Sequence, residues 1–145
     1  DYAAVAANMQ TFQTAAWLAR FALGNVVGEA EIPRFYEALQ VALGRLAARA
    51  GAVRLHGAGD RDGTEDNTRD IAITGACLVY LDEHGLLSDY ANAQRQRRRR
   101  DLLLDMGVGR QKPPKLSHAD WERILQWVVN LLHHTECHVP PLPGN

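Results

Sequence analysis

Five arginines stand within six residues of this chain, at Arg95, Arg97, Arg98, Arg99 and Arg100. The guanidinium group is planar, is always charged in proteins, and can donate two parallel hydrogen bonds to phosphate oxygens. No residue from 94 to 101 is hydrophobic, so a helix through this segment would be polar all round and would have no face to pack. The segment therefore predicts a surface that meets solvent or a polyanion, and we expect the backbone of a nucleic acid.

Three further basic residues, Arg110, Lys112 and Lys115, extend the positive strip along a linker that contains two prolines. Residues 92–115 carry eight basic and two acidic side chains, whereas residues 1–90 carry seven basic and twelve acidic ones. A weakly acidic body with one concentrated basic segment suits a polyanion partner. We therefore predict that these eight basic residues bind nucleic acid with weak sequence preference, since phosphate contacts carry little base information. Tyr90 is the only aromatic residue near the run, which favours backbone contact over base stacking.

A second segment contains residue types that could do phosphate chemistry, Asp60-Arg61-Asp62-Gly63-Thr64. It resembles the D-x-D-G-T motif of haloacid-dehalogenase-type phosphatases over five residues. The resemblance implies Asp60 as nucleophile, Asp62 as general acid and base, and a Mg²⁺ ion. In that family the motif follows a buried strand of a parallel sheet and is followed by a hydrophobic residue. Here the preceding residues are rich in glycine and charge, Glu65 follows the motif, and no strand–helix alternation is present.

Four potential zinc ligands stand close together at His133, His134, Cys137 and His138. They form two pairs with i,i+4 spacing, and on a helix the two pairs would point about 100° apart. A structural zinc site needs four ligands, so a second source would be required. We interpret the group instead as a polar helix end, where imidazoles meet exposed carbonyls and the negative end of the helix dipole. We expect no metal, no cofactor and no enzymatic activity.

The composition is typical of one globular domain, with 145 residues, 46% of them hydrophobic and 23% charged. No apolar stretch approaches the ~18 residues that a membrane span needs, and no signal peptide is visible, so we expect no membrane partner. Cys77 and Cys137 are too few for a disulfide scaffold. The composition favours a reducing compartment, which would be intracellular (cytoplasm or nucleus) or the interior of a virion.

Five segments carry helical periodicity, and none shows strand alternation, so we predict an all-α fold with a compact bundle of about five helices. A domain over residues 1–138 would contain an acidic, glycine-rich loop at 56–68 and be followed by a proline-rich tail at 139–145. Gly51 and Gly85 are expected to end the second and third helices. The expected helices run from residue 2 to near 24, from 32 to about 50, from about 67 to 83, from 86 to 106, and onward from a cap at Ser117.

Apolar stripes predict which face of each helix is buried. The first stripe is Tyr2, Val5, Met9, Phe12, Ala16, Ala19 and Leu23, widened by Trp17, Leu18 and Phe21. The second is Phe35, Leu39, Ala42, Leu43 and Leu46, and the third is Ile71, Thr74, Cys77, Leu78 and Leu81. The fifth helix carries Trp121, Ile124, Leu125, Val128, Leu131 and Leu132 on one face. Trp127 lies off that stripe, which favours a contact with another chain.

The sequence leaves three hypotheses open. The first is a non-enzymatic, self-associating structural protein, such as a nucleoprotein or coat subunit, whose basic segment neutralises phosphate. The second is a protein-interaction or adaptor module whose arginines meet an acidic partner and whose proline-rich tail recruits another protein. The third, and most remote, is a small phosphatase that uses Asp60 and Asp62.

Overall fold

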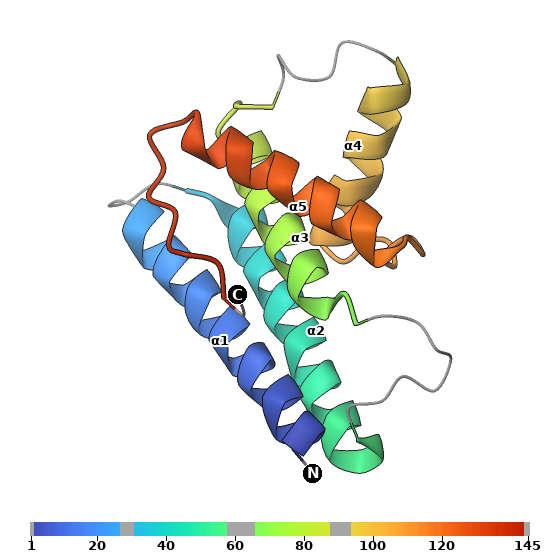
Figure 1. The fold of residues 1–145 in the computed structure, drawn as a ribbon. Helices are drawn as coiled ribbons and strands as arrows, with labels where there is room; N and C mark the ends of the chain where they lie inside the picture. The colour runs from blue at the N-terminus through green and yellow to red at the C-terminus, as the bar shows by residue number, and fades with distance from the viewer. Residues whose placement is uncertain (1, 27–30, 58–65, 88–93, 144–145) are drawn as a thin grey trace.

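The computed structural model describes residues 2–26, 31–57, 66–87 and 94–143, and over these residues the chain forms five α-helices and no strand. The expected all-α bundle is confirmed. In Figure 1 the first three helices lie side by side, the fifth crosses the third, and the fourth flanks the third. The helices are α1 (Tyr2–Asn25), α2 (Pro33–His56), α3 (Thr68–Glu83), α4 (Gln94–Gly107) and α5 (His118–His133).

Helix α3 is the centre of the bundle. It contacts each of the other four helices, and every residue from Ala72 to Leu81 is buried. A helix surrounded on all sides must be apolar all round, and this explains why a single stripe underestimates its buried surface. Ile71, which the stripe places inward, is only half-buried, at the edge of the core.

An aromatic cluster joins the first three helices. Trp17 and Phe21 of α1 stack with their ring centroids 5.4 Å apart, and Phe21 also meets Tyr80 of α3 edge-on at 5.2 Å. Phe35 of α2 contacts the Tyr80 ring at 5.3 Å. Trp17, Phe21 and Phe35 are completely buried. Offset and edge-to-face ring pairs add a favourable electrostatic term to the burial of large apolar surfaces, so this cluster anchors α1.

The prediction for the buried face of α1 was wrong for its main stripe, whereas Trp17, Leu18 and Phe21, which were predicted to widen that face, are buried. Five large residues of the predicted stripe are exposed, and the buried face consists of Thr14, Trp17, Leu18 and Phe21. Both faces of this helix are apolar, so periodicity alone could not decide which one meets α2 and α3. The exposed residues and their exposed fractions are Tyr2 (89%), Val5 (58%), Met9 (56%), Phe12 (75%) and Leu23 (84%).

Two helix boundaries and one stripe residue also differ from the predictions. Gly51 does not end α2, which continues to His56 and ends at Gly57, where φ is +82°. Residues 86 and 87 are not helical as predicted, because a Schellman motif ends α3 just before them, and the described part of α4 begins at Gln94. In that motif Gly85 has φ of +72° and the Leu86 amide donates to the Leu81 carbonyl at 2.8 Å. Leu43 of α2 is 44% exposed rather than buried.

The predictions for α5 are confirmed. The Ser117 hydroxyl accepts a hydrogen bond from the Asp120 amide at 3.1 Å and caps the helix. All six residues of the predicted stripe are buried. Of the three tryptophans, Trp17 and Trp121 are in the core as expected, whereas Trp127 is half-buried.

The segment after α5 returns to pack along α1 (Figure 1, red). The indole N–H of Trp17 donates to the carbonyl of Pro140 at 2.8 Å, and the Asn25 amide group makes hydrogen bonds with both the carbonyl and the backbone N–H of His138. Arg69 of α3 donates to the carbonyl of Pro143 at 2.7 Å. This proline-rich segment therefore lies against its own chain. Most of the predicted acidic loop, residues 58–65, lies outside the described residues.

Candidate nucleic-acid interface

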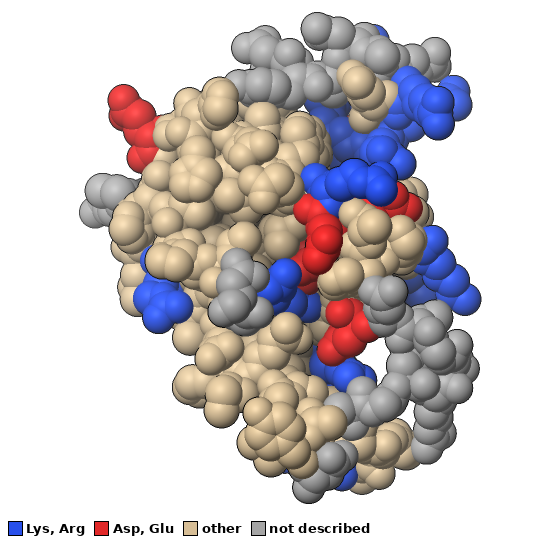
Figure 2. Space-filling view, viewed as in Figure 1, with Lys and Arg blue, Asp and Glu red and all other residues tan. Residues whose placement is uncertain are grey.

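Helix α4 has two different halves. Its C-terminal half packs into the core through Leu103, Leu104 and Met106, which are all buried. In its N-terminal half, Arg95, Arg97, Arg98 and Arg99 are exposed, and Arg100 is half-buried. Figure 1 shows the N-terminal end of α4 standing away from the bundle, and Figure 2 shows basic side chains gathered at that end with a few acidic ones at their margin. The apolar stripe thus stops where α4 leaves the core.

Close backbone packing fixes the C-terminal end of α4. Gly107 lies so near Gly75 of α3 that a Cβ atom on Gly107 would be 2.7 Å from the Gly75 carbonyl oxygen. Gly109, with φ of +83°, follows in a Schellman motif in which the Arg110 amide donates to the Asp105 carbonyl at 2.8 Å. One end of the helix is therefore held tightly, which positions the arginines at the other end.

A cation also meets the C-terminal carbonyls of α4. Arg45 of α2 donates from Nη2 to the Met106 carbonyl at 2.8 Å. Burial lowers the pKa of this guanidinium, but an arginine stays charged in proteins, so the contact complements the negative end of the helix dipole. Arg45 is therefore a structural cation and is not part of the basic surface.

Most guanidiniums of the run are not neutralised within the described part of the chain. Arg100 lies 3.4 Å from the Asp101 carboxylate, a long contact with a largely exposed partner, and exposed pairs of this kind contribute little. Among the residues that the structure describes, no carboxylate pairs with Arg95, Arg98 or Arg99. No acidic side chain of the described residues therefore neutralises these three guanidinium groups.

The three linker residues lie apart from the helical arginines. Arg110, Lys112 and Lys115 are exposed, and they follow the C-terminal end of α4. A helix of this length, 14 residues, is about 21 Å long. The eight predicted site residues therefore form two basic groups, one on the N-terminal half of α4 and one after its C-terminal end.

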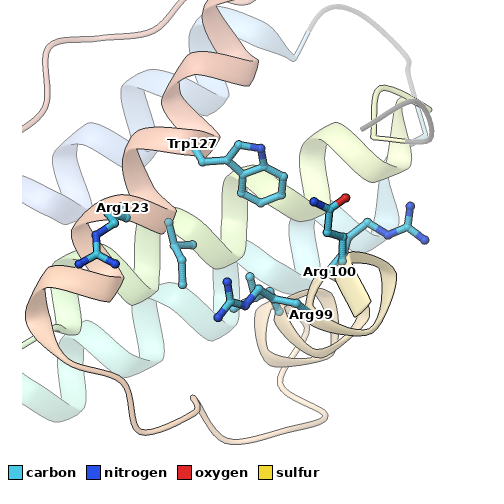
Figure 3. Close-up of a pocket in the computed structure, with 7 residues that line it drawn as sticks. Arg99, Arg100, Arg123 and Trp127 are labelled. Atoms are coloured by element: carbon cyan, nitrogen blue, oxygen red, sulfur yellow. The ribbon is translucent and has the colours of Figure 1, made fainter. Parts of the chain in front are cut away.

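A pocket of about 230 Å³ lies between α4 and α5. Its α4 wall has helical i, i+3, i+4, i+7 spacing, from Gln96 to Leu103. Figure 3 shows the Trp127 ring reaching from α5 into the space toward α4. We call this the arginine–tryptophan pocket, and its lining residues are Gln96, Arg99, Arg100, Leu103, Arg123, Ile124 and Trp127.

Only Arg99 and Arg100 of this pocket were predicted as site residues, and sequence reasoning missed the other five: Gln96, Leu103, Arg123, Ile124 and Trp127. Tyr90 was the only ring expected near the arginines, yet α5 brings an indole beside them. The one available signal was the position of Trp127 off the buried stripe of its helix. Trp127 packs against the core of its own chain and faces α4 across the pocket, and the predicted contact with another chain stays a prediction.

No protein family, curated protein or solved structure matches this chain. None of the described helices is both long and apolar enough to cross a membrane.

The histidine and cysteine group behaves as a polar helix end. His134 Nδ1 lies 2.9 Å from the carbonyl of Asn130, and the Thr135 hydroxyl donates to Cys137 Sγ at 2.8 Å. No group of three potential metal ligands occurs among the residues described. Burial, and secondarily the nearby Cys137, raises the pKa of the Cys77 thiol, so Cys77 is not an activated nucleophile.

The phosphatase-like segment lies outside the described residues. Asp60 and Asp62 are both in the range 58–65, so their geometry is not part of this structure. The residues just before it, 52–56, form the last turns of α2. The described residues nearest the motif on its N-terminal side are thus helical, whereas in haloacid-dehalogenase-type phosphatases a buried strand leads into it.

Proposed function

We propose that this protein is a non-enzymatic, self-associating structural protein that binds the backbone of nucleic acid through α4, as a nucleoprotein or coat-like subunit does. The observation that carries this proposal is the exposed arginine half of a helix whose other end is fixed in the core. Arg95 and Arg98 have no carboxylate partner among the described residues and face solvent. Phosphates can bind them with release of counterions and without breaking an ion pair to any of the described residues.

The separation of the two basic groups favours an extended ligand. The arginines lie on the N-terminal half of α4, which is about 21 Å long, and the linker residues follow its C-terminal end. A strand of several nucleotides that follows α4 would reach both groups, whereas a single phosphate would reach one. Because these contacts are to phosphates, the proposed binding has little sequence preference.

Replacing Arg95 and Arg98 together by alanine is the direct test. We expect the affinity for a fluorescent random-sequence oligonucleotide to fall about tenfold or more at low salt. The slope of log K against log salt should decrease by about two, one for each phosphate contact. Fluorescence anisotropy at several salt concentrations measures both quantities.

The matched control is the double substitution of Arg20 and Arg54 by alanine. These exposed arginines lie on α1 and α2, and their removal changes the net charge by the same amount. We expect a much smaller loss of affinity in the control. Equal losses in the two variants would mean that net charge, and not α4, governs binding, and a wild-type protein that does not bind would refute the proposal.

Self-association is proposed to use the exposed stripe of α1, with a second copy of the chain as the partner. Arg20 is the only charged residue of this 24-residue helix. Exposed apolar patches of this kind mark interaction sites, and an almost uncharged face can meet its own copy across a two-fold axis without like-charge repulsion. Phe12, at 75% exposure, lies near the middle of the stripe.

We expect Phe12→Glu to abolish self-association, since the variant places two carboxylates in a buried interface. Light scattering coupled to size-exclusion chromatography measures the effect as a shift from oligomer to monomer. Phe12→Leu keeps the stripe apolar and is expected to remain oligomeric. A wild-type protein that is monomeric at every concentration would exclude the α1 interface.

The adaptor hypothesis makes a different prediction for the proline-rich segment. A recruiting tail should be available to an external domain, but Pro140 accepts a hydrogen bond from Trp17, and Pro140 and Pro143 are buried against the chain. The basic surface could still meet an acidic protein. A protein that purifies free of nucleic acid and does not shift an oligonucleotide would favour that alternative.

A further inference from the structure

We propose that the arginine–tryptophan pocket binds one unpaired base of a single nucleic-acid strand, with the base against Trp127 and the neighbouring phosphates on Arg99 and Arg123. This inference rests on the proposed nucleic-acid binding and deepens it, because it assigns a preference for single strands over duplexes.

The size of the pocket fits one ring system. Its volume is about 230 Å³. A water molecule occupies about 30 Å³ in the liquid, and pockets for drug-sized ligands begin at about 300 Å³. The space is therefore too large to be filled by one or two waters and too small to enclose a whole nucleotide. A planar base can enter while its sugar and phosphates remain at the rim.

The residues that line the pocket suit a ligand that combines an aromatic ring with negatively charged groups. Leu103 and Ile124 add apolar surface to the lining of the pocket, and Gln96 offers an amide that can pair with the edge of a base. Tryptophan faces stack well on bases of any sequence. None of the seven lining residues is acidic, so a cationic ligand would find no counterion in this pocket.

The positive charges of the arginines lie at the rim of the pocket, where the phosphates of the bound strand would lie. In Figure 3 the Arg99 side chain extends toward the α5 side of the pocket, toward Arg123, while Arg100 points the other way. Arg123 is largely exposed and contacts Asp120 at 3.1 Å. Such an exposed i,i+3 pair is weak and can open when a phosphate arrives.

The single-strand preference follows from the position of the ring. Trp127 is half-buried between two helices, so a base must leave its own stack to reach the ring. An unpaired strand does this at little cost, whereas a duplex must unpair and extrude the base, which costs a few kcal/mol. Duplex DNA would therefore contact the exposed arginines without filling the pocket.

Tryptophan fluorescence gives a direct readout. Trp17 and Trp121 are completely or almost completely buried, so Trp127 is the one tryptophan whose emission should respond to a ligand in this pocket. We expect oligo-dT and oligo-rU to quench the emission on binding and a duplex of equal length to quench it much less. Comparing the two single-stranded probes distinguishes a DNA from an RNA preference.

Trp127→Leu is expected to weaken single-strand binding about tenfold, the effect of losing one stacked base, and to leave duplex binding unchanged. Trp127→Phe, which keeps an aromatic face, should retain most of the affinity. Because Trp127 also packs against the core, Arg123→Gln provides a second variant at an exposed position, and it should weaken single-strand binding without changing the melting temperature.

Failure of this inference is distinguishable from failure of the proposed function. The first outcome is that single strands and duplexes both bind through Arg95 and Arg98, but no probe quenches the tryptophan emission. If Trp127→Leu then changes neither the single-strand affinity nor the duplex affinity, the pocket does not bind a base. If the wild-type protein binds neither probe, the nucleic-acid function itself is refuted, and this inference with it.

Discussion

Replacing Gly107 by alanine is expected to lower the free energy of unfolding by about 2–3 kcal/mol. The new Cβ atom would stand 2.7 Å from the carbonyl oxygen of Gly75 and 2.9 Å from Cγ2 of Val79. A backbone oxygen in the middle of α3 cannot move aside, so α3 and α4 must separate. The separation would also shift the arginines, and we expect nucleic-acid affinity to fall in the same variant.

Urea unfolding followed by circular dichroism measures the change in stability. Gly44→Ala is the matched control, because it lies within α2 and a Cβ atom there would meet nothing within 4 Å. Alanine is the better helix former, so the control should stabilise the protein by about 0.5–1 kcal/mol. Stabilisation by Gly107→Ala as well would show that α3 and α4 do not approach each other this closely.

Phe21→Ala is expected to cost about 3–5 kcal/mol, the largest effect of a single substitution that we predict. Phe21 is completely buried and contacts the rings of Trp17, Phe35 and Tyr80. Its removal would leave a cavity where α1, α2 and α3 meet, and the three remaining rings cannot collapse into it without losing their own contacts.

The control for Phe21 is the same substitution on the opposite face of α1. Phe12 is 75% exposed, and Phe12→Ala should change stability by no more than about 0.5 kcal/mol when the protein is monomeric. Thermal unfolding of both variants at low protein concentration gives the comparison. A similar loss in both would contradict the assignment of the buried face.

The contrast between α5 and α1 shows what periodicity can determine. The solvent side of α5 is strongly polar, so its single apolar stripe indicates the buried face, and Ser117 indicates its first turn. Helix α1 has apolar residues all round, and the choice between its two faces depends on the positions of α2 and α3. The tertiary structure decides which helices pack against α1, so the spacing of apolar residues within α1 does not indicate the buried face.

Glycines show that helix ends, too, cannot be predicted from local sequence alone. Gly57, Gly85 and Gly109 end or follow helices in conformations with positive φ, whereas Gly51 lies within α2. A glycine inside a helix costs only about 1 kcal/mol, and the rest of the helix can compensate for that cost. A glycine therefore permits a helix to end but does not require it to end.

The candidate site was predictable in part. The arginine run is a local pattern that interrupts an apolar stripe, and its exposure follows from that interruption. The pocket depends on the crossing of two helices that are separated in sequence by a proline-containing linker. Arg99 and Trp127 become neighbours only after α4 and α5 have both packed on α3, so no spacing rule could have paired them.

The hydrogen bonds between α1 and the segment after α5 constrain the order in which the molecule can be completed. Trp17 and Asn25 find their partners 123 and 113 residues further along the chain. These hydrogen bonds can therefore form only after residues 138–143 have been made. A chain truncated before residue 138 would lack these hydrogen-bond partners and would expose this flank of α1, so we expect truncation there to destabilise α1 against the rest of the bundle.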